Sequence, residues 1–177
     1  WAFSIMRDGK VADPIRDLYA HAFVLLAIAS YVEATGKSDA LTMADETLAF
    51  LDDNLLAPRG GGYVEAVPLR AGHRRQNPHM HLFEALLALW ECSQQSRYLE
   101  RAEELFVLLK SRFFQSGSGA LIEYFDDGLR PAAGLDGTVL KTHSWIKFGG
   151  TRSHASATVA CLVGTGSRAN VVIVDCS

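Results

Sequence analysis

The alternation of apolar and polar residues along the chain predicts four helices. Apolar side chains recur three or four positions apart, which places them on one face of a helix, in residues 14–35, 39–56, 78–95 and 98–114. The first stretch begins with Asp13 and Pro14, a cap followed by proline, and ends at Gly36. Asn77 and Pro78 repeat that start signal for the third stretch.

Glycine-rich turns and short extended segments separate the predicted helical pairs. The first pair is followed by glycines at 60–62, a short strand over 63–67 and a polar loop over 69–76. The second pair is followed by a turn, a strand over 121–125 and another turn. Helical pairs of this kind must stack on neighbours to bury their second face. The pattern therefore predicts an all-α fold of helical hairpins, and its start at Trp1 predicts that the chain belongs to something longer.

The composition of the chain indicates which classes of binding partner to expect. The net charge is −3 and Lys and Arg form no long block, so we expect no binding of nucleic acid or of an acidic membrane surface. No apolar run reaches about 18 residues, so no membrane span is expected. The cysteines Cys92, Cys161 and Cys176 have no CxxC spacing, which favours incidental thiols in a reducing, cytoplasmic compartment.

The start of the third predicted helix carries polar residues with catalytic potential. Asn77, His81 and Glu84 are spaced i, i+4 and i+7, which places them on one face near the N-terminal end. Such groups are costly to bury unless they bond to each other or to a polar ligand. Free N–H groups at a helix start suit sugar oxygens or phosphate. The alternative is structural: Asn77 as a cap, His81 as a satisfied core histidine and Glu84 as an acceptor.

The first predicted helix offers Tyr19, four positions before Phe23. A tyrosine there can stack on a sugar ring and donate its hydroxyl, although an amphipathic core position explains it equally well. His21 faces elsewhere, and we expect no role for it. Arg74 and Arg75 are expected in a solvated loop, with contact to a substrate phosphate left open.

Metal and dinucleotide sites are not predicted. His79 and His81 are two positions apart and therefore lie on different helix faces, unlike a zinc pair. Residues 164–169 fit GxGxxA, but only eight residues follow, too few for the helix and strand that a dinucleotide needs.

These segments carry a family resemblance. Residues 1–4, 17–27 and 75–85, the last containing Asn-x-x-x-His-x-x-Glu-Ala, resemble the N-acylglucosamine 2-epimerase superfamily over roughly residues 1–137. That group includes N-acylglucosamine and cellobiose 2-epimerases and bacterial mannose or mannose-6-phosphate isomerases. The resemblance implies a partial (α/α)6 barrel with a sugar pocket at one end, lined by residues matching Tyr19, Asn77 and His81. It also implies proton transfer next to a carbonyl, with histidines as acid and base and without metal or other cofactor.

The resulting prediction is a sugar isomerase that interconverts an aldose and a ketose, of the mannose or mannose-6-phosphate type. We expect His81 to be catalytic and the sugar or sugar phosphate to be bound by Tyr19, Asn77, Glu84 and Arg75. A 2-epimerase of N-acylglucosamine or cellobiose is the alternative within the family, and a non-catalytic helical-repeat binding module is the alternative of another class. A homodimer is one oligomeric state left open.

The chain also departs from the family pattern. The family arginine that contacts the sugar precedes Trp1, and the family segment Glu-Pro-Gly-His-x-x-Glu-Trp is replaced over 139–145. Neither His143 nor His154 stands in that motif. We therefore predict a sugar isomerase domain over 1–137 and hypothesise that residues 138–177 are a divergent tail, out of frame or foreign. This fragment alone is expected to have little activity.

Overall fold

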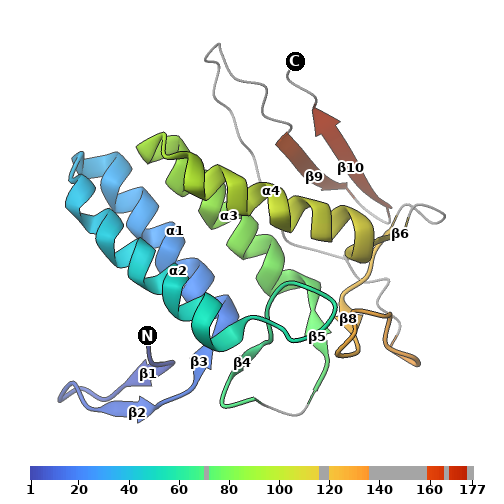
Figure 1. The fold of residues 1–177 in the computed structure, drawn as a ribbon, viewed down its shortest axis with the longest axis horizontal. Coiled ribbons are helices and arrows are strands. Elements are labelled where there is room, and N and C mark those ends of the chain that lie inside the picture. Colours follow the sequence, from blue (N-terminus) through green and yellow to red (C-terminus); the bar gives the residue numbers. More distant parts are fainter. Residues whose placement is uncertain (70–71, 116–119, 136–158, 166–167, 175–177) are drawn as a thin grey trace.

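The computed structural model describes residues 1–69, 72–115, 120–135, 159–165 and 168–174 (Figure 1). The four predicted helices are confirmed in this part of the chain: α1 (Leu18–Thr35), α2 (Leu41–Leu55), α3 (Gln76–Ser93) and α4 (Ser96–Leu108). A 3-10 turn, η1 (Ser38–Ala40), precedes α2, and a π turn, η2 (Leu109–Phe113), continues α4.

The helices pack in two layers. α1 lies along α3, while α2 packs on α1 and α4 packs on α3 (Figure 1). One core cluster fills the space between them and includes the fully buried Leu18, Leu25, Leu51, Leu82 and Leu86. Ion pairs from Arg97 to Asp45 and from Arg101 to Asp52 join α4 to α2 at the edge of this core. The two hairpins therefore share one hydrophobic interior.

Short strands gather near the N-terminal ends of α1 and α3. β3 (Arg16–Asp17) pairs with β4 (Ala66–Val67), and β5 (Arg74–Arg75) pairs with β8 (Tyr124–Phe125), both antiparallel. Two further antiparallel pairs are β1 (Ser4–Ile5) with β2 (Val11–Asp13) and β6 (Phe114–Gln115) with β7 (Ala120–Leu121). The short segments expected between helices are thus present, and they bring loops from distant parts of the sequence to one end of the helical layers.

Two predicted helix starts were wrong. α1 begins four residues later than expected, and Asp17 rather than Asp13 caps it by accepting a hydrogen bond from the Ala20 N–H at 2.9 Å. The residues just before α1 pair with β4 and so are held extended. α3 begins at Gln76, which places Asn77 inside the first turn instead of at the cap. The predicted stop at Gly36 is confirmed, with φ of 69°.

The length and hydropathy of α1 bear on the expectation that no segment spans a membrane. Its 18 residues have a mean hydropathy of 1.4, so by length and composition it is apolar enough to cross a membrane. The core helix of a globular domain satisfies the same test, and 39% of α1 is buried inside the structure. The buried positions include Leu18, Leu25 and Ile28, which belong to the core cluster shared with α2 and α3.

The last strands are β9 (Val159–Thr165) and β10 (Arg168–Val174), an antiparallel pair. Gly164 and Ala169, the ends of the GxGxxA match, are partners in this ladder. Residues 168–174 are therefore a strand, whereas a dinucleotide-binding turn is followed by a helix. His143, His154 and the segment 139–145 lie outside the described residues.

Candidate functional site

Two aromatic rings from α1 surround the His81 ring of α3. The ring centroids of Tyr19 and His81 are 5.2 Å apart at 87°, and those of Phe23 and His81 are 4.8 Å apart. Tyr19 and Phe23 are themselves 4.8 Å apart and remain 38% and 40% exposed. With Glu84 these residues form the aromatic–histidine cluster. Large aromatic rings that stay partly exposed around a histidine are available to stack on a ligand.

Glu84 orients the His81 ring. The distance from His81 Nδ1 to Glu84 Oε2 is 3.0 Å, and the two side chains are 15% and 22% exposed. An ionised carboxylate only accepts, so Nδ1–H donates to Glu84 and the neutral ring keeps Nε2 as its basic nitrogen. Within the described part of the chain, Nε2 has no hydrogen-bond partner. A histidine held through one nitrogen, with the other unengaged, is arranged for proton transfer.

His79, two residues earlier on α3, is a structural histidine. It is 2% exposed, its Nδ1–H donates to the Arg75 carbonyl at 2.9 Å, and its Nε2 accepts from the Tyr63 N–H at 3.0 Å. Burial lowers the pKa of His79 to about 4, so the ring is neutral at physiological pH. Both of its nitrogens are used inside the protein. The structural alternative weighed for His81 therefore describes His79.

His21 is also a core residue, which the sequence did not predict. It is 1% exposed, its Nδ1–H donates to the Asp17 carbonyl at 2.7 Å, and its ring stacks on Phe50 of α2. Burial lowers the pKa of His21. Its contacts lie on the α2 side of α1, away from the aromatic–histidine cluster.

A second polar group lies at the start of α3. Glu65 accepts from the Arg75 backbone N–H at 2.7 Å and from Arg75 Nε at 2.8 Å. Glu123, which precedes β8, accepts from the Gln76 N–H through its carbonyl at 3.0 Å and from the backbone of Asn77 through its carboxyl. We call Glu65, Arg75, Asn77 and Glu123 the helix-start group. It places two of the predicted residues, Arg75 and Asn77, one to two helical turns before His81.

Two carboxyl groups of the helix-start group titrate abnormally. Burial, reinforced by the negative charge of Glu65, raises the pKa of Glu123 to about 7, although Arg75 and the Asn77 hydrogen bond oppose this. Burial also raises the pKa of Glu65, against the influence of Arg75. Shifts of this kind in half-buried carboxyls gather at functional sites.

Arg74 corrects the expectation of a solvated loop. Its side chain is buried, at 4% exposure, and its guanidinium donates to the carbonyls of Arg59 at 3.0 Å, Tyr63 at 3.1 Å and Asp127 at 3.2 Å, and also to that of Gly61. Burial lowers the pKa of Arg74. The guanidinium joins loops that are far apart in sequence, and a local pattern cannot show such partners. Arg75, by contrast, has a side chain that is 39% exposed.

Sequence reasoning missed Glu65 and Glu123. Each stands in a short extended segment between helices, where one acidic residue among apolar and turn residues is unremarkable. They reach Arg75 and Asn77 only because β3 pairs with β4 and β5 pairs with β8. No local spacing signals that arrangement.

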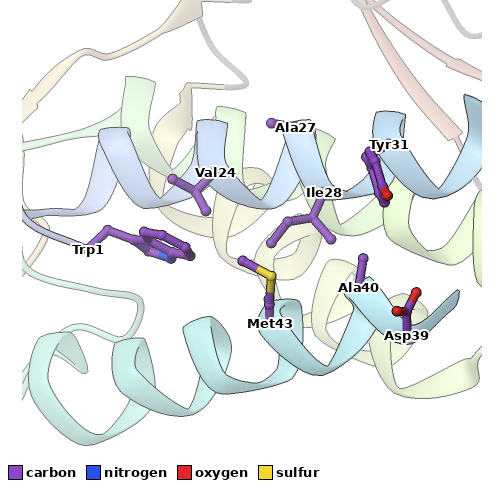
Figure 2. A pocket seen from close by; sticks show the side chains of 8 residues that line it. All are labelled: Trp1, Val24, Ala27, Ile28, Tyr31, Asp39, Ala40 and Met43. Atoms are coloured by element: carbon purple, nitrogen blue, oxygen red, sulfur yellow. The ribbon is translucent and has the colours of Figure 1, made fainter. Parts of the chain in front are cut away.

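A pocket of about 520 Å³ lies between α1 and α2, away from the predicted residues (Figure 2). Asp39 is the one carboxylate in a lining that is otherwise mainly apolar: Trp1, Val24, Ala27, Ile28, Tyr31, Asp39, Ala40 and Met43. This pocket holds no histidine, so it does not support acid–base chemistry on a sugar. Among the described residues, no three side chains of His, Cys, Asp or Glu are grouped to hold a metal ion, and metal-free chemistry stays a prediction.

The comparisons with known proteins agree with the resemblance. The family model for N-acylglucosamine 2-epimerase (GlcNAc 2-epimerase) matches residues 1–155, which extends beyond residue 137. A mannose-6-phosphate isomerase of Rhizobium meliloti (strain 1021) is 36% identical over 139 residues, 76% of this chain and 35% of that protein. A cellobiose 2-epimerase of Dictyoglomus turgidum (strain DSM 6724 / Z-1310) is 24% identical over 137 residues, 70% of this chain and 35% of that protein. The chain thus spans about a third of the length of these relatives.

The solved structures confirm the fold. The cellobiose 2-epimerase of Spirochaeta thermophila DSM 6192 superposes with a TM-score of 0.65 at 30% identity, over 75% of this chain and 36% of that one. The two helical layers described here are therefore part of an (α/α)6 barrel, with α1 and α3 side by side.

Proposed function

Because this chain belongs to the N-acylglucosamine 2-epimerase family, we propose that the protein containing it isomerises a sugar by moving a proton next to a carbonyl. The favoured reaction is aldose–ketose interconversion of the mannose type. The observation that carries this proposal is His81, held by Glu84 through Nδ1 and flanked by the rings of Tyr19 and Phe23.

In the proposed reaction the sugar is bound in its open-chain form. Nε2 of His81 takes the proton from C2 of the aldose, and the electron pair of that C–H bond forms a C1–C2 double bond. The π pair of the C1 carbonyl moves to O1, which takes up a proton, and an enediol results. The imidazolium that results is stabilised by the Glu84 carboxylate on Nδ1, as an acidic partner stabilises a catalytic histidine elsewhere. When C1 takes up a proton, O2 releases its own and the C2 carbonyl of the ketose forms, so two protons are gained and two are lost and no redox cofactor is needed.

The remaining predicted residues have binding roles in this proposal. Tyr19 stacks on the sugar and offers its hydroxyl. Asn77, on the first turn of α3, offers an amide to sugar hydroxyls, and the exposed part of Arg75 lies at the same end. Glu84 acts through His81. These assignments are supported by the contact of Tyr19 with His81 and by the position of Asn77 one turn before His81.

Epimerisation at C2 is the alternative within the same chemistry. The same C2 proton is removed, but a proton returns to the opposite face of C2. This alternative is supported by the likeness to proteins named cellobiose 2-epimerase. The two reactions require the same first step from His81. They differ in the position of the acid that returns a proton to the sugar.

We further propose that the 177-residue chain alone has little activity. It spans about a third of its relatives, and returning the proton requires an acid that the described residues do not place opposite His81. We also propose a cytoplasmic location, based on cysteines that show no disulfide or metal spacing.

Proton exchange with solvent tests the proposal. The complete protein is incubated in D₂O with mannose, fructose, N-acetylglucosamine and cellobiose, and the products are analysed by NMR. Mannose isomerisation is expected to give fructose with deuterium at C1, whereas epimerisation would place deuterium at C2 of both epimers. Absence of exchange with every sugar, by a folded complete protein, would favour a non-catalytic binding module and overturn the proposal.

A further inference from the structure

The hydrogen bond from His81 to Glu84 fixes one atom of the imidazole and leaves its plane free to tilt. The two residues are three positions apart on α3, and the bond of 3.0 Å joins Nδ1 to a single carboxylate oxygen. The last torsion of a histidine side chain has broad preferences, so α3 itself does not set the tilt of the ring. The contacts that set it come from another helix.

Two rings on α1 supply these contacts. Tyr19 meets the His81 ring edge to face, with 5.2 Å between the centroids and 87° between the planes. Phe23 meets the same ring at 4.8 Å and 48°, and it meets Tyr19 at 4.8 Å and 44°. Three rings therefore touch pairwise, and contacts between such rings favour particular orientations.

Phe23 differs from Tyr19 in having no polar atom. The Tyr19 hydroxyl has a binding role in the proposed function, so its removal would change two things at once. The Phe23 ring can neither bond to a sugar hydroxyl nor carry a proton. Its influence on the reaction is therefore limited to packing, either against His81 or against the sugar.

Phe23 is also not part of the hydrophobic core. It is 40% exposed and belongs to neither cluster of core residues found in the described part of the chain. The core side of α1 is formed by other residues, among them Leu18, Leu25 and Ile28. Because leucine is at least as good a helix former as phenylalanine, Phe23→Leu should remove the ring and leave the fold intact.

We propose that Phe23 is a positioning residue, whose ring against the His81 imidazole holds the plane in which Nε2 takes the proton. The inference rests on the proposed function, because that function makes Nε2 the proton acceptor. Proton transfer is sensitive to geometry, and a misplacement of about 1 Å can cost about a hundredfold in rate. Since Phe23 contacts both His81 and Tyr19, loss of its ring would open space beside the imidazole and let it tilt.

The kinetics of Phe23→Leu in the complete protein test the inference. With mannose as substrate, we expect kcat to fall about tenfold and KM to change less than twofold, because the reacting group is misaligned while the sugar contacts remain. A fall in kcat of less than about threefold overturns the inference. A rise in KM that exceeds the fall in kcat also overturns it and would show that Phe23 stacks on the sugar.

Two further variants separate positioning from a general loss of packing. Phe23→Tyr keeps a ring beside His81, and its kcat should stay within about threefold of the parent value. Phe50→Leu is the matched control, because Phe50 stacks on the core residue His21 with 5.2 Å between the centroids and 12° between the planes. Its kcat should be unchanged. Equal losses of kcat in Phe50→Leu and Phe23→Leu would overturn the assignment.

The motion of the His81 ring distinguishes this inference from the proposed function. Carbon-13 relaxation of labelled histidine rings in the complete protein should show the His81 order parameter falling by about a third in Phe23→Leu. If no sugar is converted but the ring is freed, the proposed function fails and the positioning of His81 by Phe23 stands. If mannose is converted and the ring stays as ordered as in the parent, the proposed function stands and the inference fails.

Discussion

His79 and His81 are two residues apart on α3, yet they stand in opposite environments. His79 faces the loop that carries Tyr63 and the ring of Phe113, at 2% exposure and with both nitrogens bonded to backbone. His81 faces the exposed rings on α1, with Nδ1 on a carboxylate and Nε2 unpartnered within the described residues. One imidazole has both nitrogens bonded inside the protein, and the other has one nitrogen without a partner among the described residues, as the proposed proton transfer requires.

Both side chains are histidines, so residue type does not distinguish them. They differ in burial and in the number of ring nitrogens that are hydrogen-bonded inside the protein. A neutral histidine with both nitrogens bonded to backbone is fixed in one tautomer and cannot accept a proton without losing a bond. A histidine bonded only through Nδ1–H can accept a proton at Nε2 without losing a hydrogen bond.

The largest effect is expected on the stability of the protein, from His79→Ala. The change removes two buried hydrogen bonds, leaves the Tyr63 N–H without its acceptor and opens a cavity, which together should lower the free energy of unfolding by about 3 kcal/mol. Urea unfolding of the complete protein measures it. His81→Ala, measured alongside, should cost less than about 1 kcal/mol. Equal losses for the two variants would remove the distinction between the faces.

The next effect is the loss of activity in His81→Ala. The complete enzyme should lose at least tenfold in kcat/KM, or about 1.4 kcal/mol of transition-state stabilisation, because the proton acceptor is removed. His73→Ala is the control, since His73 is exposed and packs only against Tyr124 among the described aromatic rings. An unchanged rate for His81→Ala would assign His81 to a structural role.

A smaller effect is expected from Glu84→Gln. The amide can still hold the Nδ1–H but no longer stabilises the imidazolium, so kcat should fall about threefold to tenfold with little change in KM. Glu91→Gln removes a carboxyl from the exposed far end of the same helix and serves as the matched control. A fall in both variants would indicate a general effect of charge on α3.

The smallest effect concerns the pH dependence of stability. The pKa of Glu123 is raised from 4.5 to about 7, so the folded protein binds the proton more tightly than the unfolded chain. Its contribution to stability should therefore fall as pH rises from about 4.5 to about 7 and stay low above that. Glu123→Gln should remove this decline and raise the melting temperature relative to the parent by about 2 °C more at pH 8 than at pH 5. A constant difference across this range would contradict the raised pKa.

The helices could be predicted because the spacing of apolar residues within each segment determines its buried face. In α2, for example, the regularly spaced leucines are the residues that are buried. It misplaced the start of α1 because Asp13 and Asp17 are both competent caps, and the choice depends on pairing with β4, about 50 residues away. Tyr19 and His81 could be singled out from spacing and resemblance together. Their ring contact, which makes them one cluster, depends on the packing of α1 on α3.

The carboxyl groups around Arg75 could not be predicted. The sequence left open whether Arg75 would meet a phosphate, because charge at one residue says nothing about partners from other loops. Glu65 and Glu123 arrive there through two separate strand pairs. The contrast between Arg74 and Arg75 was not predicted either. Adjacent residues on a strand point to opposite faces, and only the fold decides which face is buried.

Glu65 connects the starts of two helices that are far apart in the sequence. Its carbonyl holds the first residue of α1 and its carboxylate holds the residue just before α3, so a single backbone position fixes the gap between Tyr19 and Asn77. Lengthening or shortening the segment 63–67 would widen or narrow that gap while the reacting histidine and its carboxylate stayed in place on their own helix. The relative position of Tyr19 and Asn77 therefore depends in part on a residue that belongs to neither helix.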